Sequence, residues 1–163
     1  MNAPDHITTC LWFDHQAEEA ANFYTSVFKN SKILNTSYYG DAGHEIHGQK
    51  AGTVLTVDFE LNGHKFQALN GGPHFKFNEA ISLVVNCETQ EEIDYYWEKL
   101  SSDPNAEQCG WLKDKFGLSW QIVPSMIEEY MNGSVTEKRD RMMDALLRMK
   151  KLDIATLKKV YEG

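Results

Sequence analysis

The sequence is short of basic residues, cysteine and long apolar runs, and each shortage excludes a class of protein. Its 163 residues hold 16 lysines and arginines against 24 aspartates and glutamates, which gives a net charge of −8. A general nucleic-acid binder needs a basic face to release counterions, so nucleic acid is not an expected partner. No apolar run approaches the roughly 18 to 20 residues of a membrane-spanning helix, and MNAPDHITT lacks the regions of a signal peptide. We therefore expect a cytoplasmic protein without a membrane partner.

Cysteine is also scarce. The three cysteines, Cys10, Cys87 and Cys109, are odd in number and lack the spacing of a metal site. We interpret them as small buried thiols in a reducing compartment rather than as a disulfide framework. Cys10 and Cys109 are also considered as nucleophiles, but neither has an identifiable base in the sequence.

The few basic residues are concentrated near the C-terminus. Eight lysines and arginines, among them all three arginines of the chain, lie between Lys138 and Lys159 with only three acidic residues. This segment is interpreted either as a solvated helix face or as a contact with an acidic surface of the same or a partner subunit.

What the sequence does contain is an internal repeat. FGLSWQIV (116–123) resembles NGHKFQAL (62–69), and residues 17–28 align with 90–101 at an offset of 73 residues. The first of these alignments places Gln67 over Gln121. The offset of 73 residues, extended to the strands before the helices, places Thr9 over Ser82. Such self-similarity indicates two related modules.

Hydrophobic periodicity and turn residues place the elements of each module. Strands are predicted at 6–13, 33–39, 53–61, 64–69, 80–86, 108–113 and 118–123. Helices are predicted after Asp14 and Thr89, which are expected to cap them, with Glu92 completing a capping box at Thr89. Asn62-Gly63 predicts a tight hairpin. Helices are also predicted at 126–131, 136–149 and 154–161. We therefore expect a domain over 1–124, with modules at about 6–70 and 79–124, and a helical extension over 125–163.

The segments ITTCLWFDHQAEEAANFY, LNGGP with Phe75 and Phe77, AISLVVNCET and CGWLKDKFGLSWQIVP cover most of residues 6–125. They resemble the vicinal oxygen chelate superfamily, which includes glyoxalase I and bleomycin-resistance proteins, and above all its PhnB-like branch, also labelled 3-demethylubiquinone 3-methyltransferase-like. The resemblance implies an α+β fold in which two βαβββ modules form a curved mixed sheet around a cavity, followed by a C-terminal helical tail. It also implies a homodimer.

The resemblance and the repeat together suggest a ligand-binding cavity. Metal-dependent members of the superfamily place four ligands at positions that map onto Thr9, Gln67, Ser82 and Gln121. Side chains alternate between the two faces of a strand, so residues two positions from these four should also face the cavity. The predicted cavity residues are Thr9, Leu11, Phe13, Gln67, Ser82, Val84 and Gln121.

The chemistry of these residues argues against a metal. Hydroxyl and amide oxygens offer little charge to a divalent cation, which in this fold needs imidazole or carboxylate ligands. His44 and His47 do not form an HExxH motif and are interpreted as exposed loop residues. The turn after the first strand, Phe13 to Gln16, has no glycine, so a nucleotide-like cofactor of a methyltransferase is not expected either. We expect neither metal nor cofactor.

Three functional hypotheses follow. The first is a homodimeric, metal-free protein that binds a small molecule. The alternative is a metalloenzyme of the lyase, isomerase or dioxygenase type, or a metal-free enzyme, acting on a small metabolite. The third assigns an interaction role to the basic C-terminal segment.

Overall fold

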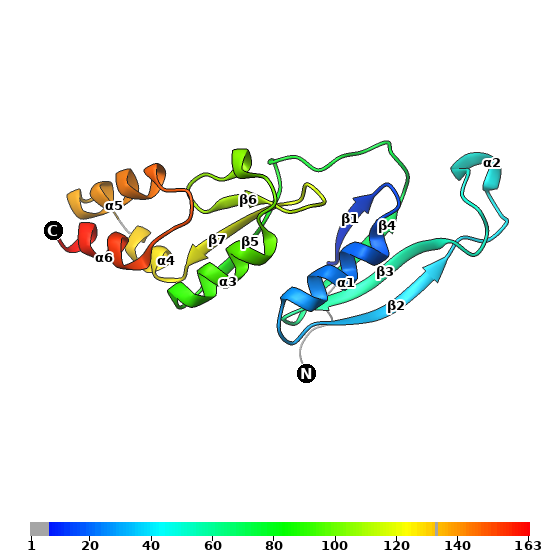
Figure 1. Cartoon of the computed structure of the whole chain (residues 1–163), viewed down its shortest axis with the longest axis horizontal. Coiled ribbons are helices and arrows are strands. Elements are labelled where there is room, and N and C mark those ends of the chain that lie inside the picture. Colours follow the sequence, from blue (N-terminus) through cyan, green and yellow to red (C-terminus); the bar gives the residue numbers. More distant parts are fainter. Residues whose placement is uncertain (1–6, 133) are drawn as a thin grey trace. The chain divides into compact units, whose positions relative to one another are not determined.

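A computed structural model describes residues 7–132 and 134–163. The chain forms two compact units, the first ending at Lys76 and the second running from Phe77 to Gly163 (Figure 1). Each unit combines a mixed sheet with helices, which confirms the α+β fold class. The division into a domain over 1–124 and an extension over 125–163 stays a prediction. Residue 6, with which the first predicted strand begins, lies outside the described residues.

The first unit is a complete βαβββ module. Its elements are β1 (Thr9–Phe13), α1 (Ala17–Val27), β2 (Lys32–Tyr38), a short α2 (His44–His47), β3 (Val54–Leu61) and β4 (His64–Asn70). The strand order is β1-β4-β3-β2; β1 and β4 are parallel and the other pairs are antiparallel. The predicted hairpin is confirmed, since Asn62 and Gly63 both have positive φ, at 46° and 87°.

Helix α1 covers one face of the first sheet through aromatic contacts. The Tyr24 ring stacks on Phe59 with centroids 6.2 Å apart, and Phe59 stacks on Phe66 at 5.4 Å. Tyr24 and Phe59 are fully buried. The α1 face of this sheet is therefore the core of the first unit, and the opposite face is the one left available for a ligand.

The start of α1 is fixed by a residue that is distant in sequence. Asp14 was expected to cap this helix, but the N-cap is Gln16 and its side chain makes no capping bond. Instead, Asn70 Oδ1 accepts a hydrogen bond from Ala17 N at 2.8 Å, and Asn70 Nδ2 donates to Val54 O at 3.0 Å. The helix thus begins where the end of β4 supplies an acceptor for its first free N–H group.

The second unit has a shorter sheet. Its elements are β5 (Ser82–Cys87), α3 (Gln90–Leu100), the 3₁₀ turn η1 (Pro104–Ala106), β6 (Trp111–Lys113) and β7 (Ser119–Pro124). The order is β5-β7-β6, with β5 parallel and β6 antiparallel to β7. The predicted cap of α3 is confirmed, because Thr89 Oγ1 accepts from Glu92 N at 3.2 Å.

Three strands form this sheet, as predicted at 80–86, 108–113 and 118–123, whereas the βαβββ pattern of the resemblance has a fourth. The strand predicted at 108–113 begins at Trp111, because Cys109 and Gly110 have positive φ, at 41° and 88°, which extended backbone cannot have. No strand corresponding to β2 follows α3 in the described chain, and residues 104–106 form η1 instead.

The C-terminal helices α4 (Met126–Met131), α5 (Glu137–Arg148) and α6 (Ile154–Glu162) agree with prediction. They enclose a small core of Met142, Leu152 and Leu157, each at most 1% exposed. The linker between α5 and α6 is bonded to the second sheet, since Cys109 N donates to Met149 O at 2.7 Å and Gly110 N to Lys150 O at 2.8 Å. The helices are thus an integral part of the second unit.

Part of the basic charge of this segment is paired within the chain. Lys151 Nζ lies 2.5 Å from an oxygen of Asp94, and Lys150 Nζ lies 3.6 Å from an oxygen of Glu107. The pKa of Asp94 is lowered, chiefly because its carboxylate accepts a hydrogen bond from Lys151. Two lysines of the basic segment are therefore paired with carboxylates of the same chain. Among the described residues, no helix is long and apolar enough to cross a membrane.

Candidate functional site

The strand register decides which side chains of β1 face away from α1. Thr9 is aligned with Phe66 and Cys10 with Gln67 in the parallel β1–β4 pair. Aligned residues point to the same face of a sheet. Thr9 therefore shares the α1 face with Phe66, and Cys10 shares the open face with Gln67. Thr9 and Gln67, which were expected to meet in one cavity, lie on opposite faces.

Thr9 lies on the unexpected face because the turn between β1 and α1 is one residue longer than the corresponding turn of the second module. Three residues, 14–16, join β1 to α1, whereas two, 88–89, join β5 to α3. Helices α1 and α3 are therefore related by an offset of 73 residues, but strands β1 and β5 are related by an offset of 74. With this offset, Thr8 and not Thr9 corresponds to Ser82. A shift of one residue reverses the face of every side chain in a strand. Leu11 and Phe13 accordingly point to the core and are 5% and 3% exposed.

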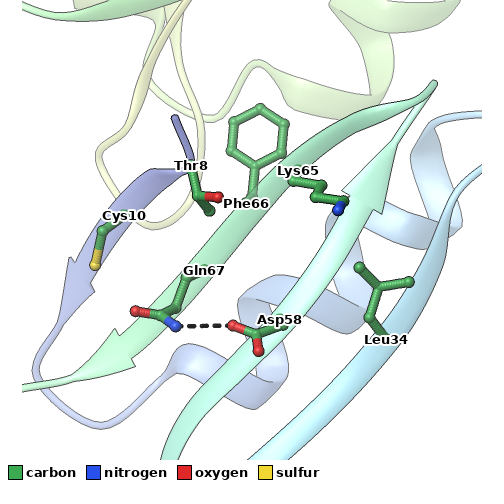
Figure 2. Close-up of a pocket in the computed structure, with 7 residues that line it drawn as sticks. All are labelled: Thr8, Cys10, Leu34, Asp58, Lys65, Phe66 and Gln67. Carbon is green, nitrogen blue, oxygen red and sulfur yellow. Dashed lines mark hydrogen bonds between the residues drawn. The ribbon is translucent and has the colours of Figure 1, made fainter. Parts of the chain in front are cut away.

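A pocket of about 330 Å³ lies on the open face of the first sheet (Figure 2). Gln67 Nε2 donates a hydrogen bond of 2.9 Å to Asp58 Oδ1 across the β3–β4 pair. Figure 2 shows the Gln67 amide pointing at this carboxylate, with Cys10 on the neighbouring strand. The residues that line the pocket are Thr8, Cys10, Leu34, Asp58, Lys65, Phe66 and Gln67.

Of the predicted cavity residues, this pocket contains Gln67. Asp58 was missed, although the sequence carries its signal: it is a carboxylate in the middle of a strand whose alternate residues Val57 and Phe59 are core. A charged residue at that place must point to the open face. Thr8 and Cys10 were missed because the face of β1 was assigned from the helix alignment.

The Cys10 thiol is held in its neutral form. Cys10 is exposed, so the expectation of a buried thiol is wrong here. Partial desolvation still raises the pKa of this thiol, and the negative charge of Asp58 raises it further. The Cys87 thiol is buried more completely, and burial together with Glu92 and Glu88 raises the pKa of Cys87 to about 12. Neither environment activates a nucleophile, because activation requires a lowered thiol pKa.

Replacing Asp58 with asparagine should speed the alkylation of Cys10. The negative charge that disfavours the thiolate is removed, so the pKa of Cys10 falls and the thiolate fraction at pH 8 rises. We expect the rate with iodoacetamide to increase about threefold or more, since each pKa unit is worth about tenfold in thiolate. Mass spectrometry of the Cys10 peptide measures this rate, and the Cys87 peptide, which should stay unmodified in the folded protein, is the control. An unchanged Cys10 rate would show that the two groups do not share the pocket.

The second sheet brings together the predicted residues of its own module. Val84 is aligned with Gln121, and Gln121 Nε2 donates a 2.9 Å hydrogen bond to Ser82 Oγ. Val84 on the same face is 52% exposed. Trp120 points to the opposite face, where it is 2% exposed and its Nε1 donates to Asp114 Oδ2 at 2.8 Å.

The donor sets of the two sheets do not fit a divalent metal. The corresponding positions in the two sheets offer hydroxyls from Thr8 and Ser82 and amides from Gln67 and Gln121, all neutral groups. Within residues 7–132 and 134–163, no three His, Cys, Asp or Glu side chains gather as metal ligands.

The histidines of α2 bond to their own loop. His44 Nδ1 lies 2.9 Å from Gln49 O, and His47 Nε2 lies 3.1 Å from Ala42 O. Both histidines are thus engaged with backbone oxygens of the segment around α2.

The turn between β1 and α1 does not fit a nucleotide-like cofactor. The first free N–H of α1, that of Ala17, is already bonded to Asn70. The carbonyls of Phe13 and Asp14 accept hydrogen bonds from Gly71 N and Gly72 N, at 2.9 and 3.2 Å. One of the N–H groups that would hold a phosphate at such a turn, and two of the carbonyls beside it, are therefore used within the fold.

Sequence comparison identifies the family. The sequence model of 3-demethylubiquinone-9 3-methyltransferase matches residues 5–123. The chain belongs to this family. A solved structure described as a putative 3-demethylubiquinone-9 3-methyltransferase, PhnB protein, from Bacillus cereus is 42% identical, covers 74% of this chain and 99% of its own, and has a TM-score of 0.60. The chain is thus PhnB-like.

Two further solved structures are similar to this PhnB-like chain. A protein from Staphylococcus aureus is 32% identical over 75% of this chain and 97% of its own, with a TM-score of 0.33. Protein PA1353 from Pseudomonas aeruginosa is 15% identical over 72% of this chain and 96% of its own, with a TM-score of 0.54, and supports the fold alone. No curated protein matches the sequence. The family match ends at residue 123, before α4–α6.

Proposed function

We propose that this PhnB-like chain is a small-molecule binding protein that operates without the metal of its superfamily and holds its ligand on the open face of the first sheet. The observation that supports this most directly is the pocket in which Gln67 fixes the Asp58 carboxylate at 2.9 Å. Its volume of about 330 Å³ lies at the lower end of the range for ligand sites, which suits a ligand of metabolite size.

The pocket offers a hydrogen-bond acceptor, a hydrogen-bond donor and an apolar side chain. The bond from Gln67 uses Asp58 Oδ1, so Asp58 Oδ2 can accept a donor from a ligand, and the Lys65 ammonium can donate. Leu34, 44% exposed, offers apolar surface at the same site. A small polar molecule with an apolar part matches this combination.

The proposal includes a homodimer in the cytoplasm. Strand β2 is at the edge of the first sheet and exposes Ile33, Leu34 and Tyr38 at 38%, 44% and 59%. An exposed apolar edge strand favours pairing with another chain. Light scattering during size-exclusion chromatography measures the mass in solution, and a monomer at micromolar concentration would contradict the dimer.

A thermal-shift screen against metabolites tests the binding function. A ligand at about 100 times its Kd should stabilise the protein by about 2.7 kcal/mol, which corresponds to a Tm rise of roughly 5–10 °C. Asp58→Asn and Gln67→Ala should abolish the shift. Glu60→Gln, which changes the next outward-facing carboxylate of β3 outside the pocket, should retain it.

Two outcomes would overturn this function. A ligand shift that survives in both Asp58→Asn and Gln67→Ala would place the binding site elsewhere. Stoichiometric Zn, Ni, Mn or Fe in the purified protein, lost in Gln67→Ala or Gln121→Ala, would favour the metalloenzyme hypothesis instead.

A further inference from the structure

The pocket of the first sheet carries two opposite charges that are not paired with each other. Asp58 on β3 and Lys65 on β4 both line it. Asp58 Oδ1 accepts a hydrogen bond from Gln67 Nε2 at 2.9 Å, which leaves Oδ2 as an acceptor. Lys65 is exposed and forms no ion pair among the described residues. Each charge is therefore accessible to a group of opposite sign on a ligand.

The strand register sets the spacing of these two charges. Asp58 is aligned with Gln67 in the antiparallel β3–β4 pair, and Lys65 lies two residues before Gln67 on the same face of β4. Asp58 and Lys65 are thus diagonal neighbours, which lie roughly 7–8 Å apart in such a pair. A ligand whose ammonium and carboxylate are separated by a short carbon chain can reach both, because the lysine side chain is flexible.

Charged residues make this face of the sheet dipolar. The partner of Asp58 on β2 is Asn35 and its partner on β4 is a glutamine, so the only charge of these three residues is negative. In the next row, Glu60 is aligned with Lys65 on β4 and with Lys32 on β2. Two lysines against one glutamate leave this row with an excess of positive charge. Such a face is complementary to a ligand that carries both signs.

Gln67 holds the Asp58 carboxylate away from Lys65. Figure 2 shows the carboxylate directed at the Gln67 amide, with Lys65 and Leu34 on the side of Asp58 that is remote from Cys10. A direct ion pair between Asp58 and Lys65 would neutralise the pocket, and the hydrogen bond from Gln67 competes with it. Gln67 therefore acts as a positioning residue that keeps both charges available.

A β-bulge brings apolar surface to the same pocket. The register of the β2–β3 pair shifts between Ile33 and Asn35, so that Leu34 is the extra residue of the bulge. A bulge changes the direction of a side chain and is frequent beside binding sites. Leu34 lines the pocket and is 44% exposed, so it can contact the apolar part of a ligand.

We propose that this pocket binds an amino-acid-like zwitterion, with its ammonium at Asp58 Oδ2, its carboxylate at Lys65 Nζ and its apolar side chain against Leu34. This inference deepens the proposed binding function and rests on it, since it names the class of ligand for the same pocket. Both polar contacts are hydrogen bonds between charged groups, which are stronger than neutral ones. A ligand with a single charge satisfies one of the two residues and leaves the other without a partner.

Free leucine and two analogues with a single charge test this ligand class. Isocaproate lacks the amino group and isoamylamine lacks the carboxylate, while the apolar part stays the same. In NMR titrations of the full chain, leucine should shift the backbone amide signals of Asp58 and Lys65 in a saturable way. It should bind more tightly than either analogue, by about tenfold or more. An analogue that binds as tightly as leucine would overturn the proposal, and so would the lack of a saturable shift with leucine.

Two variants show which residue meets which group of leucine. Asp58→Asn should remove the advantage of leucine over isocaproate, because the ammonium loses its anionic partner. Lys65→Gln should remove the advantage of leucine over isoamylamine, because the carboxylate loses its cationic partner. Lys50→Gln, which changes an exposed lysine of the same unit outside the pocket, should retain both preferences. Retention of both preferences in Lys65→Gln would show that the carboxylate is not bound there.

The same variants separate the ligand class from the binding function. A metabolite that binds in a way dependent on Asp58 and Gln67, but unchanged in Lys65→Gln, would show that the zwitterion assignment is wrong and that the binding function stands. If the leucine shifts were unchanged in both Asp58→Asn and Gln67→Ala, leucine would bind elsewhere, and the proposal for this pocket would be overturned.

Discussion

Replacing Asp114 with alanine should lower the free energy of unfolding by about 3 kcal/mol. Asp114 is 3% exposed, and its carboxylate accepts three hydrogen bonds. Phe116 N and Leu118 N donate to Oδ1 at 2.8 and 3.1 Å, and Trp120 Nε1 donates to Oδ2 at 2.8 Å. One side chain therefore closes the turn between β6 and β7 and orients the largest side chain of β7.

The loss of stability in Asp114→Ala should be large because alanine leaves buried hydrogen-bond donors unpaired. Hydrogen bonds to a charged group contribute about 1.5–3 kcal/mol, and a buried donor left unpaired costs about 1–3 kcal/mol. Leu118 and Trp120, which carry two of the three donors, are each 2% exposed, so water cannot replace the carboxylate without local opening. Asp114→Asn keeps one carbonyl oxygen as an acceptor and should lose less stability than alanine.

Urea unfolding followed by tryptophan fluorescence and circular dichroism measures this loss. Asp103→Ala provides the control, because Asp103 caps η1 in an exposed position through one bond to Asn105 N at 3.0 Å. Removing such a cap should cost about 1 kcal/mol or less. Equal losses in the two variants would mean that the network around Asp114 does not stabilise the fold as we infer.

Replacing Gly71 with alanine should destabilise the first unit by about 2–3 kcal/mol. A Cβ atom at this position would lie 2.3 Å from Cζ2 of the Trp12 indole, far inside any tolerated contact. The backbone cannot move away without breaking a hydrogen bond, because Gly71 N donates to Phe13 O at 2.9 Å. The indole is held as well, since Trp12 Nε1 donates to Gly72 O at 2.8 Å and its ring packs edge-on against Phe75 with centroids 4.8 Å apart.

A double-mutant cycle tests whether the Trp12 ring is the cause. In a Trp12→Ala background the methyl group meets no indole, so Gly71→Ala should then cost almost nothing, giving a coupling energy of about 2 kcal/mol. Gly40→Ala is the matched control, because no atom lies within 4 Å of its added Cβ and its backbone is not left-handed. Additive losses in the cycle would show that the strain arises in the backbone and not against Trp12.

Local patterns in the sequence were sufficient for most of the elements and for the family. The alternation of Val57, Phe59 and Leu61 determined the core face of β3, and Asn62-Gly63 determined the hairpin that follows. Thr89 with Glu92 determined the start of α3. Each of these signals acts over a few residues, so neighbours along the chain are enough to specify the result.

Several features of the candidate sites depended on pairings between distant segments. The sequence determined that β1 alternates, but the β1–β4 register, together with one extra residue in the β1–α1 turn, decided that Cys10 and not Thr9 lies beside Gln67. The Asp58 acceptor of Gln67 and the Asn70 acceptor at α1 likewise appeared only in the folded chain. The alternation within a strand shows which of its residues share a face, but it does not show which residues of two distant strands are aligned. Tertiary packing sets that register and therefore decides which polar groups meet.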